Sequence, residues 1–174
     1  VIAASAVTGG TVTTLGQDLN INSLSFTGSG PASTNSFTLA ADGHTLTLNA
    51  ANGFTDQNSV NYAAGTGLVV QAGSAAQTIA ANLLLGRSET WEIDNSAANA
   101  LMVSGAVGDG GLGFSLTKTG AGTLILSGAN TYAGSTNVNG GTIVFAGDET
   151  GIGSALNVEN GTLQLATGGS LSSA

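Results

Sequence analysis

Apolar and polar residues alternate in short stretches along most of this 174-residue chain. Alternation with a period of two is typical of β-strands that bury one face. Gly, Asn, Ser and Asp separate the stretches, and these residues favour turns. The pattern therefore predicts an all-β chain with strands at 19–26, 37–39, 45–48, 68–70, 78–79, 83–85, 91–94, 101–103 and 114–116.

Residues 75–85 admit a second interpretation, an amphipathic helix, because Ala and Leu favour helices intrinsically. We prefer strands here, since Thr78, Ile79 and the flanking Gly73 and Gly86 fit strands that end in tight corners. Residues 52–61 are polar, and we expect them to form a loop that bulges outward.

Three strand-like pieces near the end of the chain each begin with Gly-Thr, at Gly122, Gly141 and Gly161. The pieces are 19 and then 20 residues apart, and Asn137 recurs at the same step as Asn157. A pattern that returns at a fixed step marks a chain that passes the same place once per turn, as a solenoid does. We predict one domain over residues 1–174, with about eight coils of about 20 residues each.

Residues one coil apart occupy equivalent places in a solenoid. We therefore expect Val138 to stack on Val158, and Ile143 on Leu163, with all four side chains pointing inward.

The segment from Leu116 to Ile143 carries a specific order of residues. It reads Lys118-Thr-Gly-Ala-Gly-Thr-Leu124, then Leu126-Ser-Gly-Ala-Asn-Thr-Tyr-Ala-Gly134, then Thr136 and Gly140-Gly-Thr142. This segment closely resembles the autotransporter-associated β-strand repeat, also called the passenger-associated transport repeat. We call residues 116–143 the signature repeat. The signature positions that we single out, including one later repeat of the pattern, are Lys118, Gly120, Gly122, Leu124, Gly128, Asn130, Tyr132, Gly134, Gly141 and Gly161.

The resemblance implies a right-handed parallel β-helix within a large secreted bacterial surface protein. It also implies a role for the repeat in export and folding of such stalks, and it brings no catalytic residues.

Charged residues make up only 7% of the chain, against about 25% in an ordinary globular domain. Two basic residues against ten acidic ones give a net charge of −8. Binding to nucleic acid or to anionic lipid needs a cationic surface, so we expect neither partner. Cysteine is absent, which excludes disulfides and thiolate metal sites, and no apolar run approaches the about 18 residues of a membrane helix.

Glu89, Glu92 and Asp94 are the densest group of chemically capable side chains. Paired carboxylates could act as acid and base on a sugar, and Trp91 could stack on the sugar ring. The alternative is an ordinary alternating strand in which Trp91 and Ile93 face inward while Glu92 and Asp94 face outward. We prefer this structural interpretation.

Other single residues also have simple structural interpretations. His44 has no second histidine with which to form a familiar metal motif, so we expect a solvated turn residue. Asp109 and the pair Asp148-Glu149 could ligate calcium, but solvation at turns is the better explanation. Gly120 and Gly122 resemble part of a phosphate loop without its Gly-Lys-Ser/Thr, and we expect them at coil corners. We expect Asn130 and Tyr132 to pack or hydrogen-bond at a corner.

These observations favour a non-catalytic structural or interaction segment of a secreted bacterial surface protein: a rigid stalk, adhesive surface or fibre subunit. We expect no catalytic, cofactor-binding or metal-binding residues and no cofactor. The expected partners are flanking repeats of the same polypeptide or further copies added head to tail, and a glycan or protein at the surface. The alternative is a carbohydrate-active β-helix that uses Glu89, Glu92 and Asp94.

Overall fold

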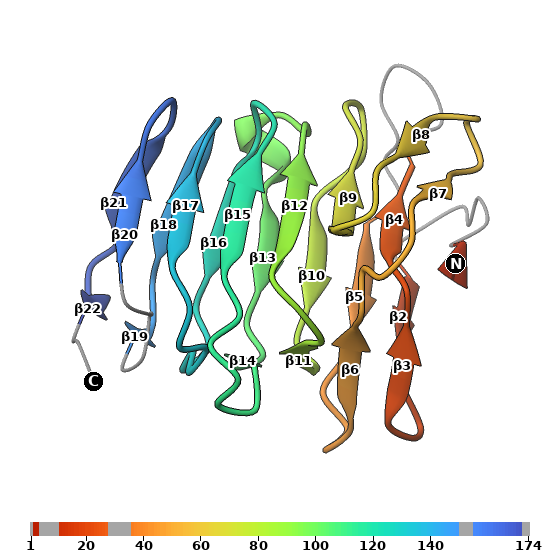
Figure 1. Ribbon diagram of the computed structural model, residues 1–174, viewed down its shortest axis with the longest axis horizontal. Helices are drawn as coiled ribbons and strands as arrows, with labels where there is room; N and C mark the ends of the chain where they lie inside the picture. Colours follow the sequence, from red (N-terminus) through yellow and green to blue (C-terminus); the bar gives the residue numbers. More distant parts are fainter. Residues whose placement is uncertain (1, 4–10, 28–35, 150–154, 172–174) are drawn as a thin grey trace.

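A computed structural model describes residues 2–3, 11–27, 36–149 and 155–171. The chain winds into a parallel β-helix, and the strands of successive coils lie side by side along the long axis (Figure 1). The N-terminal strands lie at the right end of Figure 1 and the C-terminal strands at the left end. Each complete coil visits three faces in the same order, and we name the sheets on these faces A, B and C.

Sheets A and B each contain seven strands, and sheet C contains four. Sheet A comprises β1 (Ile2–Ala3), β4 (Leu24–Phe26), β9 (Thr66–Val70), β12 (Glu89–Ile93), β15 (Leu116–Thr119), β17 (Thr136–Val138) and β20 (Leu156–Val158). Sheet B comprises β2 (Thr11–Thr13), β5 (Phe37–Leu39), β10 (Gln77–Ile79), β13 (Leu101–Val103), β16 (Thr123–Leu126), β18 (Thr142–Phe145) and β21 (Thr162–Leu165). Sheet C comprises β3 (Leu19–Ile21), β6 (Thr45–Leu48), β11 (Asn82–Leu85) and β14 (Val107–Gly108). Two short strands, β19 (Asp148–Glu149) and β22 (Ser170–Leu171), pair with each other further along the chain.

All pairs within the three sheets are parallel, and each strand between the first and the last of a sheet pairs with its equivalent one coil earlier and one coil later. The partners Lys118, Val138 and Val158 follow one another at the predicted step of 20 residues. The coils before them are longer: Leu24 pairs with Leu68, and Trp91 pairs with Lys118. Most of the extra residues lie in connections between strands, and one residue of β9, Gly67, shifts the register against β12.

The stretch from residue 19 to 26, predicted as one strand, is two strands on different sheets. β3 belongs to sheet C and β4 to sheet A, and Asn22 and Ser23 form the corner between them. The side chain of Ser23 donates a hydrogen bond to the carbonyl of Thr66, at 2.7 Å, and Asn22 Nδ2 donates to the carbonyl of Asn52, at 2.8 Å. Two consecutive polar residues, Asn22 and Ser23, interrupt the alternation at this corner and move the apolar positions from odd to even numbers, a signal that the prediction of one strand overlooked.

Residues 75–85 contain strands β10 and β11 with a corner at Ala80 and Ala81, so the preferred interpretation is confirmed and the helical alternative is wrong. A single helical turn, η1 (Ala97–Asn99), lies in the connection between β12 and β13.

The polar loop predicted at 52–61 contains a small antiparallel hairpin, β7 (Phe54–Thr55) and β8 (Asn61–Tyr62). The hairpin projects beside β9 at the upper right of Figure 1. The rings of Phe54 and Tyr62 stack with centroids 4.9 Å apart. Gln71, after β9, donates hydrogen bonds to the carboxylate of Asp56 and to the Tyr62 hydroxyl, and these bonds hold the hairpin against the coil.

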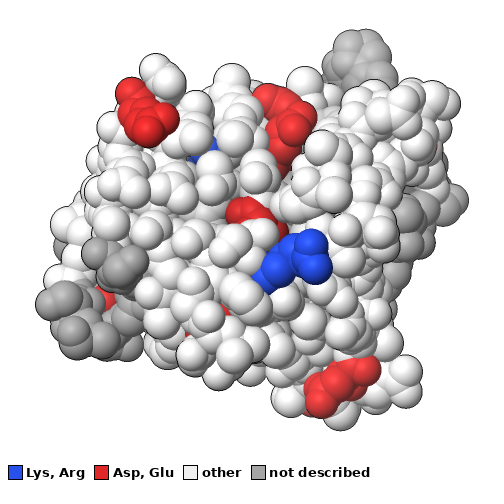
Figure 2. Space-filling view, viewed as in Figure 1, with Lys and Arg blue, Asp and Glu red and all other residues white. Residues whose placement is uncertain are grey.

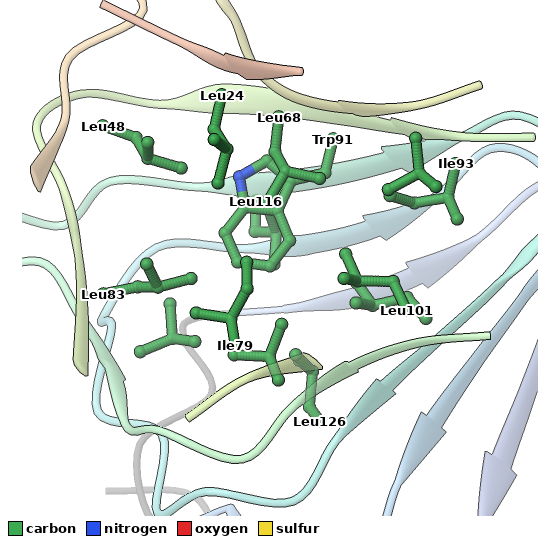
Figure 3. Close-up of a cluster of buried hydrophobic side chains, with 14 of the residues drawn as sticks. Leu24, Leu48, Leu68, Ile79, Leu83, Trp91, Ile93, Leu101, Leu116 and Leu126 are labelled. Carbon is green, nitrogen blue, oxygen red and sulfur yellow. The ribbon is translucent and has the colours of Figure 1, made fainter. Parts of the chain in front are cut away.

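The core fills the interior that the three sheets enclose, and Figure 3 shows aliphatic side chains from the different faces meeting around Trp91. Fully buried examples are Leu48 from sheet C, Trp91 from sheet A and Leu124 from sheet B. No coil can bury its own apolar side chains, because each inner side chain needs those of the adjacent coils to cover it. The apolar residues of this sequence therefore require the coils to stack.

The predicted columns are correct in register, because Val138 pairs with Val158 and Ile143 pairs with Leu163. Val138 and Ile143 are fully buried, as expected. Leu163 is only partly buried and Val158 is 45% exposed, so Val158 keeps its place in the column but lacks the burial expected of an inner side chain. These two residues lie on β20 and β21, the last strands of their sheets among the described residues, where no later coil covers the column.

This difference in burial gives a paired test of the columns. Val138→Asp places a carboxylate in an apolar interior and should lower the free energy of unfolding by about 3–5 kcal/mol. Val158→Asp makes the same chemical change one coil later, where the side chain reaches water, and should cost about 1 kcal/mol. Urea unfolding of the two variants beside the parent measures both values. Equal losses in the two variants would contradict the assignment of the columns.

Candidate functional site

The side chains of the signature repeat mostly point into the β-helix. From Gly122 to Val138 every even-numbered residue is buried, including the stretch between β16 and β17 that forms no strand. Lys118, two residues beyond Leu116 on β15, faces the same interior. The repeat therefore directs its characteristic side chains toward neighbouring coils instead of toward solvent.

Lys118 has no solvent-exposed surface, and it occupies the same column as Trp91 and Val138. Its ammonium nitrogen donates hydrogen bonds to the backbone carbonyls of Thr119, at 2.7 Å, Gly120, at 2.9 Å, and Gly140, at 3.2 Å. Thr119 and Gly120 form the corner of its own coil, and Gly140 forms the equivalent corner one coil later. The aliphatic stem therefore fills the core while the nitrogen ties two successive corners together.

Burial lowers the pKa of Lys118 to about 8, and the carboxylate of Asp94 opposes this shift. Asp94 Oδ1 also accepts a hydrogen bond from the backbone N–H of Ala121, at 3.1 Å, in the same corner. The corner at 119–121 is thus held from two sides, by a lysine from within and by an aspartate from the preceding coil.

On the third face of the β-helix, the side chain of Asn130 makes hydrogen bonds between coils where no strand is present. Its Oδ1 accepts a hydrogen bond from the backbone N–H of Val107, at 2.8 Å, in the preceding coil. Its Nδ2 donates to both carboxylate oxygens of Glu149, at 2.8 Å each, in the following coil. Both Asn130 and Glu149 are completely buried. One amide side chain therefore connects three coils, beside a backbone hydrogen bond from Thr131 N–H to the Val107 carbonyl.

Tyr132 is completely buried, and its hydroxyl lies 2.6 Å from Thr136 Oγ1. Burial raises the pKa of Tyr132 far above its ordinary value, so the hydroxyl stays protonated. The pair closes the turn between the third face and β17. The expectation that Asn130 and Tyr132 bond and pack at a corner agrees with this geometry.

Asp109 also organises a turn and is buried instead of solvated, so the expectation of a solvated turn residue was wrong. Its Oδ1 accepts a hydrogen bond from Gly111 N–H, at 2.9 Å. Its Oδ2 accepts from Phe114 N–H, at 2.9 Å, and from Ala133 N–H, at 3.1 Å, one coil later. Burial alone would raise the pKa of Asp109, but the backbone donors, led by Ala133 and Gly111, hold it below the ordinary value.

The signature glycines allow coils to approach closely. Gly120 adopts φ +78°, and a Cβ there would lie 2.4 Å from the carbonyl oxygen of Ile93 in the preceding coil. Gly141 repeats the arrangement with φ +60° and a distance of 2.2 Å to the Gly122 carbonyl oxygen. Both positions therefore require glycine for space and for backbone conformation. A Cβ would also come closer than 3.0 Å to the preceding coil at Gly122, Gly128, Gly134 and Gly161.

The three carboxylates of the alternative enzymatic site do not lie together. Glu89 has the same parity as Trp91, faces inward and is 4% exposed. Glu92 and Asp94 face outward, because they alternate with the buried Trp91 and Ile93. The alternating strand is confirmed, and the grouping of Glu89 with Glu92 and Asp94 is wrong, because β12 separates the carboxylates onto its two faces.

Glu92 and Asp94 remain as an outward pair. Partial burial raises the pKa of Glu92, and the nearby Asp94 carboxylate raises it further. Charged side chains are sparse and mostly separated on the face shown in Figure 2.

Among the described residues, neither His44 nor the calcium candidates belong to a group of side chains that could hold a metal ion. His44 Nδ1 lies 3.4 Å from Asp18 Oδ1, and both side chains are well exposed, as expected of a turn. Glu149 is buried against Asn130 instead of being solvated, so that expectation was wrong, and the side chain of Asp148 lies outside the described residues. Within the part of the chain that the structure describes, no three His, Cys, Asp or Glu side chains could together hold a metal ion.

The inward orientation of Lys118, Asp109 and Glu149 was not foreseen from the sequence. A signal for Lys118 existed, because Leu116 and Lys118 lie two residues apart on one strand and must share a face. Glu149 follows Asn130 by 19 residues, which is close to one coil, so these two residues could have been paired by the same step.

The family model of the passenger-associated-transport-repeat matches residues 116–145, which agrees with the resemblance seen in the sequence. Comparison with curated proteins and with solved structures gave no match. The chain thus carries a repeat of autotransporter passenger domains, which supports a passenger-associated role and a secreted or surface location. Among the described residues, no helix is long and apolar enough to cross a membrane.

Asn130→Asp tests the three-coil connection. The new carboxylate keeps the acceptor for Val107 N–H but meets the Glu149 carboxylate without a donor between them, so we expect a loss of about 3–5 kcal/mol in the free energy of unfolding at neutral pH. Asn157→Asp is the matched control, because Asn157 is exposed and donates only to Asn137 Oδ1 at the surface, and it should cost about 0.5 kcal/mol or less. Chemical denaturation at pH 7 measures both, and similar losses would contradict the buried role of Asn130.

Lys118→Met tests the corner tie. Methionine fills nearly the same space in the column, yet it leaves the carbonyls of Thr119, Gly120 and Gly140 without the ammonium donor. We expect the free energy of unfolding to fall by about 1–3 kcal/mol, the cost of unsatisfied buried acceptors. If Lys118→Met is instead as stable as the parent or more stable, the cost of burying the ammonium exceeds the value of its three hydrogen bonds, and the proposed tie is wrong.

Proposed function

We propose that this chain is a non-catalytic structural and interaction segment of a secreted bacterial surface protein, and that it acts as a rigid spacer which folds outside the cell. The proposal rests on where the polar side chains of the repeat lie. In the segment that matches the passenger-associated repeat, Lys118, Asn130 and Tyr132 are buried and bonded to neighbouring strands or coils. Such side chains hold a stack of coils together and are not available to an external ligand.

Rigidity follows from the pairing of the coils. Every coil is joined to the next through parallel strands on more than one face, so bending would have to break several ladders at once. Seven stacked strands about 4.8 Å apart give a rod of about 30 Å. A rod of this kind can hold another part of a polypeptide away from the cell surface without chemistry of its own.

The outer faces present mainly hydroxyl and amide groups. Asn157 Nδ2 donates to Asn137 Oδ1, at 2.8 Å, and Asn137 Nδ2 donates to Thr117 Oγ1, at 3.3 Å, which forms a ladder of polar side chains along sheet A. We propose that such surfaces contact glycans or other proteins, which hydrogen-bond readily to hydroxyl and amide groups. Arg87 and Lys118 are the chain's two basic residues, and Lys118 is buried, so we do not expect a nucleic-acid partner.

We also propose that the edge formed by β20 and β21 is continued by a further coil, either from the same polypeptide or from a second copy added head to tail. Val158 and Leu165 are 45% and 52% exposed on these strands, and a following coil would bury them as the existing coils bury Val138 and Phe145. If the edge is covered in the natural assembly, Val158→Asp should there become as damaging as Val138→Asp. An equally mild effect in the assembly would contradict this proposal.

Display of the chain on a bacterial surface, as the passenger of an autotransporter translocation domain, tests the proposed function. Asn130→Asp should reduce the amount of folded, protease-resistant passenger at the surface several-fold, because it breaks a connection between coils. The double variant Glu92→Gln/Asp94→Asn should display as the parent does, since these side chains face outward.

Two results would overturn the proposal. Normal display of Asn130→Asp would show that the signature side chains are not needed for folding after export. Cleavage of a polysaccharide by the parent that is lost in Glu92→Gln/Asp94→Asn would favour the carbohydrate-active alternative, which would then rest on these two carboxylates without Glu89.

A further inference from the structure

Glu89 is a carboxyl group inside the β-helix with very few partners. It is 4% exposed at the start of β12, and its Oε1 accepts one hydrogen bond, from the indole Nε1 of Trp91 at 2.7 Å. Its Oε2 is buried and has no hydrogen-bond partner in the described structure. A carboxylate in this position would lack the donors that normally compensate a buried charge.

A bulge in the neighbouring strand makes room for this carboxyl group. Thr66 of β9 pairs with Thr90, but the next pair joins Leu68 to Trp91, so Gly67 is left unpaired between them. A Cβ at Gly67 would lie 2.1 Å from Glu89 Oε2. The carboxyl group therefore occupies the space that any other residue at position 67 would need, and the bulge directs β9 around it.

Among the residues that the structure describes, none supplies a cation to Glu89. The neighbouring strands β9, β10 and β13 contain no ionisable residues. On the other side, β15 contributes Lys118, whose nitrogen bonds three backbone carbonyls. Glu92 lies on the outer face of β12, Arg87 is exposed in the connection before it, and Asp109 bonds backbone N–H groups in the connection before β15.

From this geometry we infer that the protonation state of Glu89 controls how firmly strands β9 and β12 are held together. We call the Glu89 carboxyl group in the Gly67 bulge the lock. The protonated acid packs into the Gly67 bulge, and loss of its proton loosens the junction. Because the hairpin β7–β8 directly precedes β9, the lock lies between the part of the rod that carries the hairpin and the part that carries the signature repeat.

The sign of the pH dependence follows from the raised pKa. Burial raises the pKa of Glu89 from 4.5 to about 8, and the Trp91 hydrogen bond opposes this only in part. Between these values the folded chain binds a proton that the unfolded chain has lost, so stability is full below pH 4.5 and falls as the pH rises to about 8. Lys118, with its pKa lowered from 10.5 to about 8, has the opposite slope only above that pH.

The lock has a biological meaning that rests on the proposed function. A segment that folds outside the cell experiences the pH of its surroundings, and burial of Glu89 costs less free energy as a neutral acid than as a carboxylate. Mild acid would therefore favour completion of the coil at β12. The physical inference itself concerns the purified chain, so it can fail or succeed independently of where the protein is displayed.

Urea unfolding of the full chain between pH 5 and 8 tests the lock, with Glu89→Gln and Glu92→Gln as the matched pair. Glu92 lies on the outer face of the same strand, and its own raised pKa gives a slope of the same sign. In the parent, the unfolding equilibrium constant should rise by up to about tenfold per pH unit for one linked proton. Glu89→Gln should remove most of this rise and be more stable than the parent at pH 8, whereas Glu92→Gln should retain it. Equal slopes in the parent and in Glu89→Gln would overturn the inference.

A second measurement needs no variant and covers the case in which Glu89→Gln fails to fold. Trp91 is the chain's single tryptophan, and its indole bonds Glu89 directly. Its fluorescence in the folded parent should change with pH, with a midpoint near 8. Constant emission from pH 5 to 9 in the folded protein would show that Glu89 does not change its charge in this range.

Discussion

Parallel pairing of each coil with the coil before it is the constraint on which the rest of this structure depends. Because Lys118, Val138 and Val158 are register partners, their side chains must all use the same column of the interior. Whether a side chain fits at an inner position therefore depends on the side chains one coil away as much as on its neighbours in sequence. The close approach at Gly120 and Gly141 has the same origin, since the corners of successive coils stack as directly as their strands.

Where the backbone ladder is interrupted, buried polar side chains take over its role. On the third face between β14 and β19, Asn130 supplies one acceptor and one donor in the directions that a strand would have used. Lys118 does the same for carbonyls that turn inward at the corners. These groups lose their hydration on burial, and the hydrogen bonds that they form to groups of the same and adjacent coils offset that cost.

The fold could be predicted from the sequence because a step of about 20 residues and a period of two are both visible in it. One feature could not be predicted, and another gave a signal that the prediction overlooked. The bulge at Gly67 depends on a neighbouring strand that is distant in sequence, whereas the consecutive polar residues Asn22 and Ser23 interrupt the alternation and mark a corner. The candidate site was misjudged at Glu89, although counting in steps of two from Trp91 places it inside. The enzymatic alternative had grouped Glu89 with Glu92 and Asp94, but the space beside Gly67 and the hydrogen bond from Trp91 accommodate its carboxyl group in the core.

The scarcity of basic residues also affects how the protein withstands proteases. A trypsin-like protease cleaves after lysine or arginine, and this chain has only Arg87 and Lys118. Lys118 is sealed in the interior with its peptide bonds on a central strand of sheet A, whereas Arg87 is exposed in the connection before β12. Proteolysis begins where the backbone can leave the fold, so the folded rod presents one such position and the second appears only when the coils separate. A chain with so few basic residues thus presents very little for this class of protease to recognise.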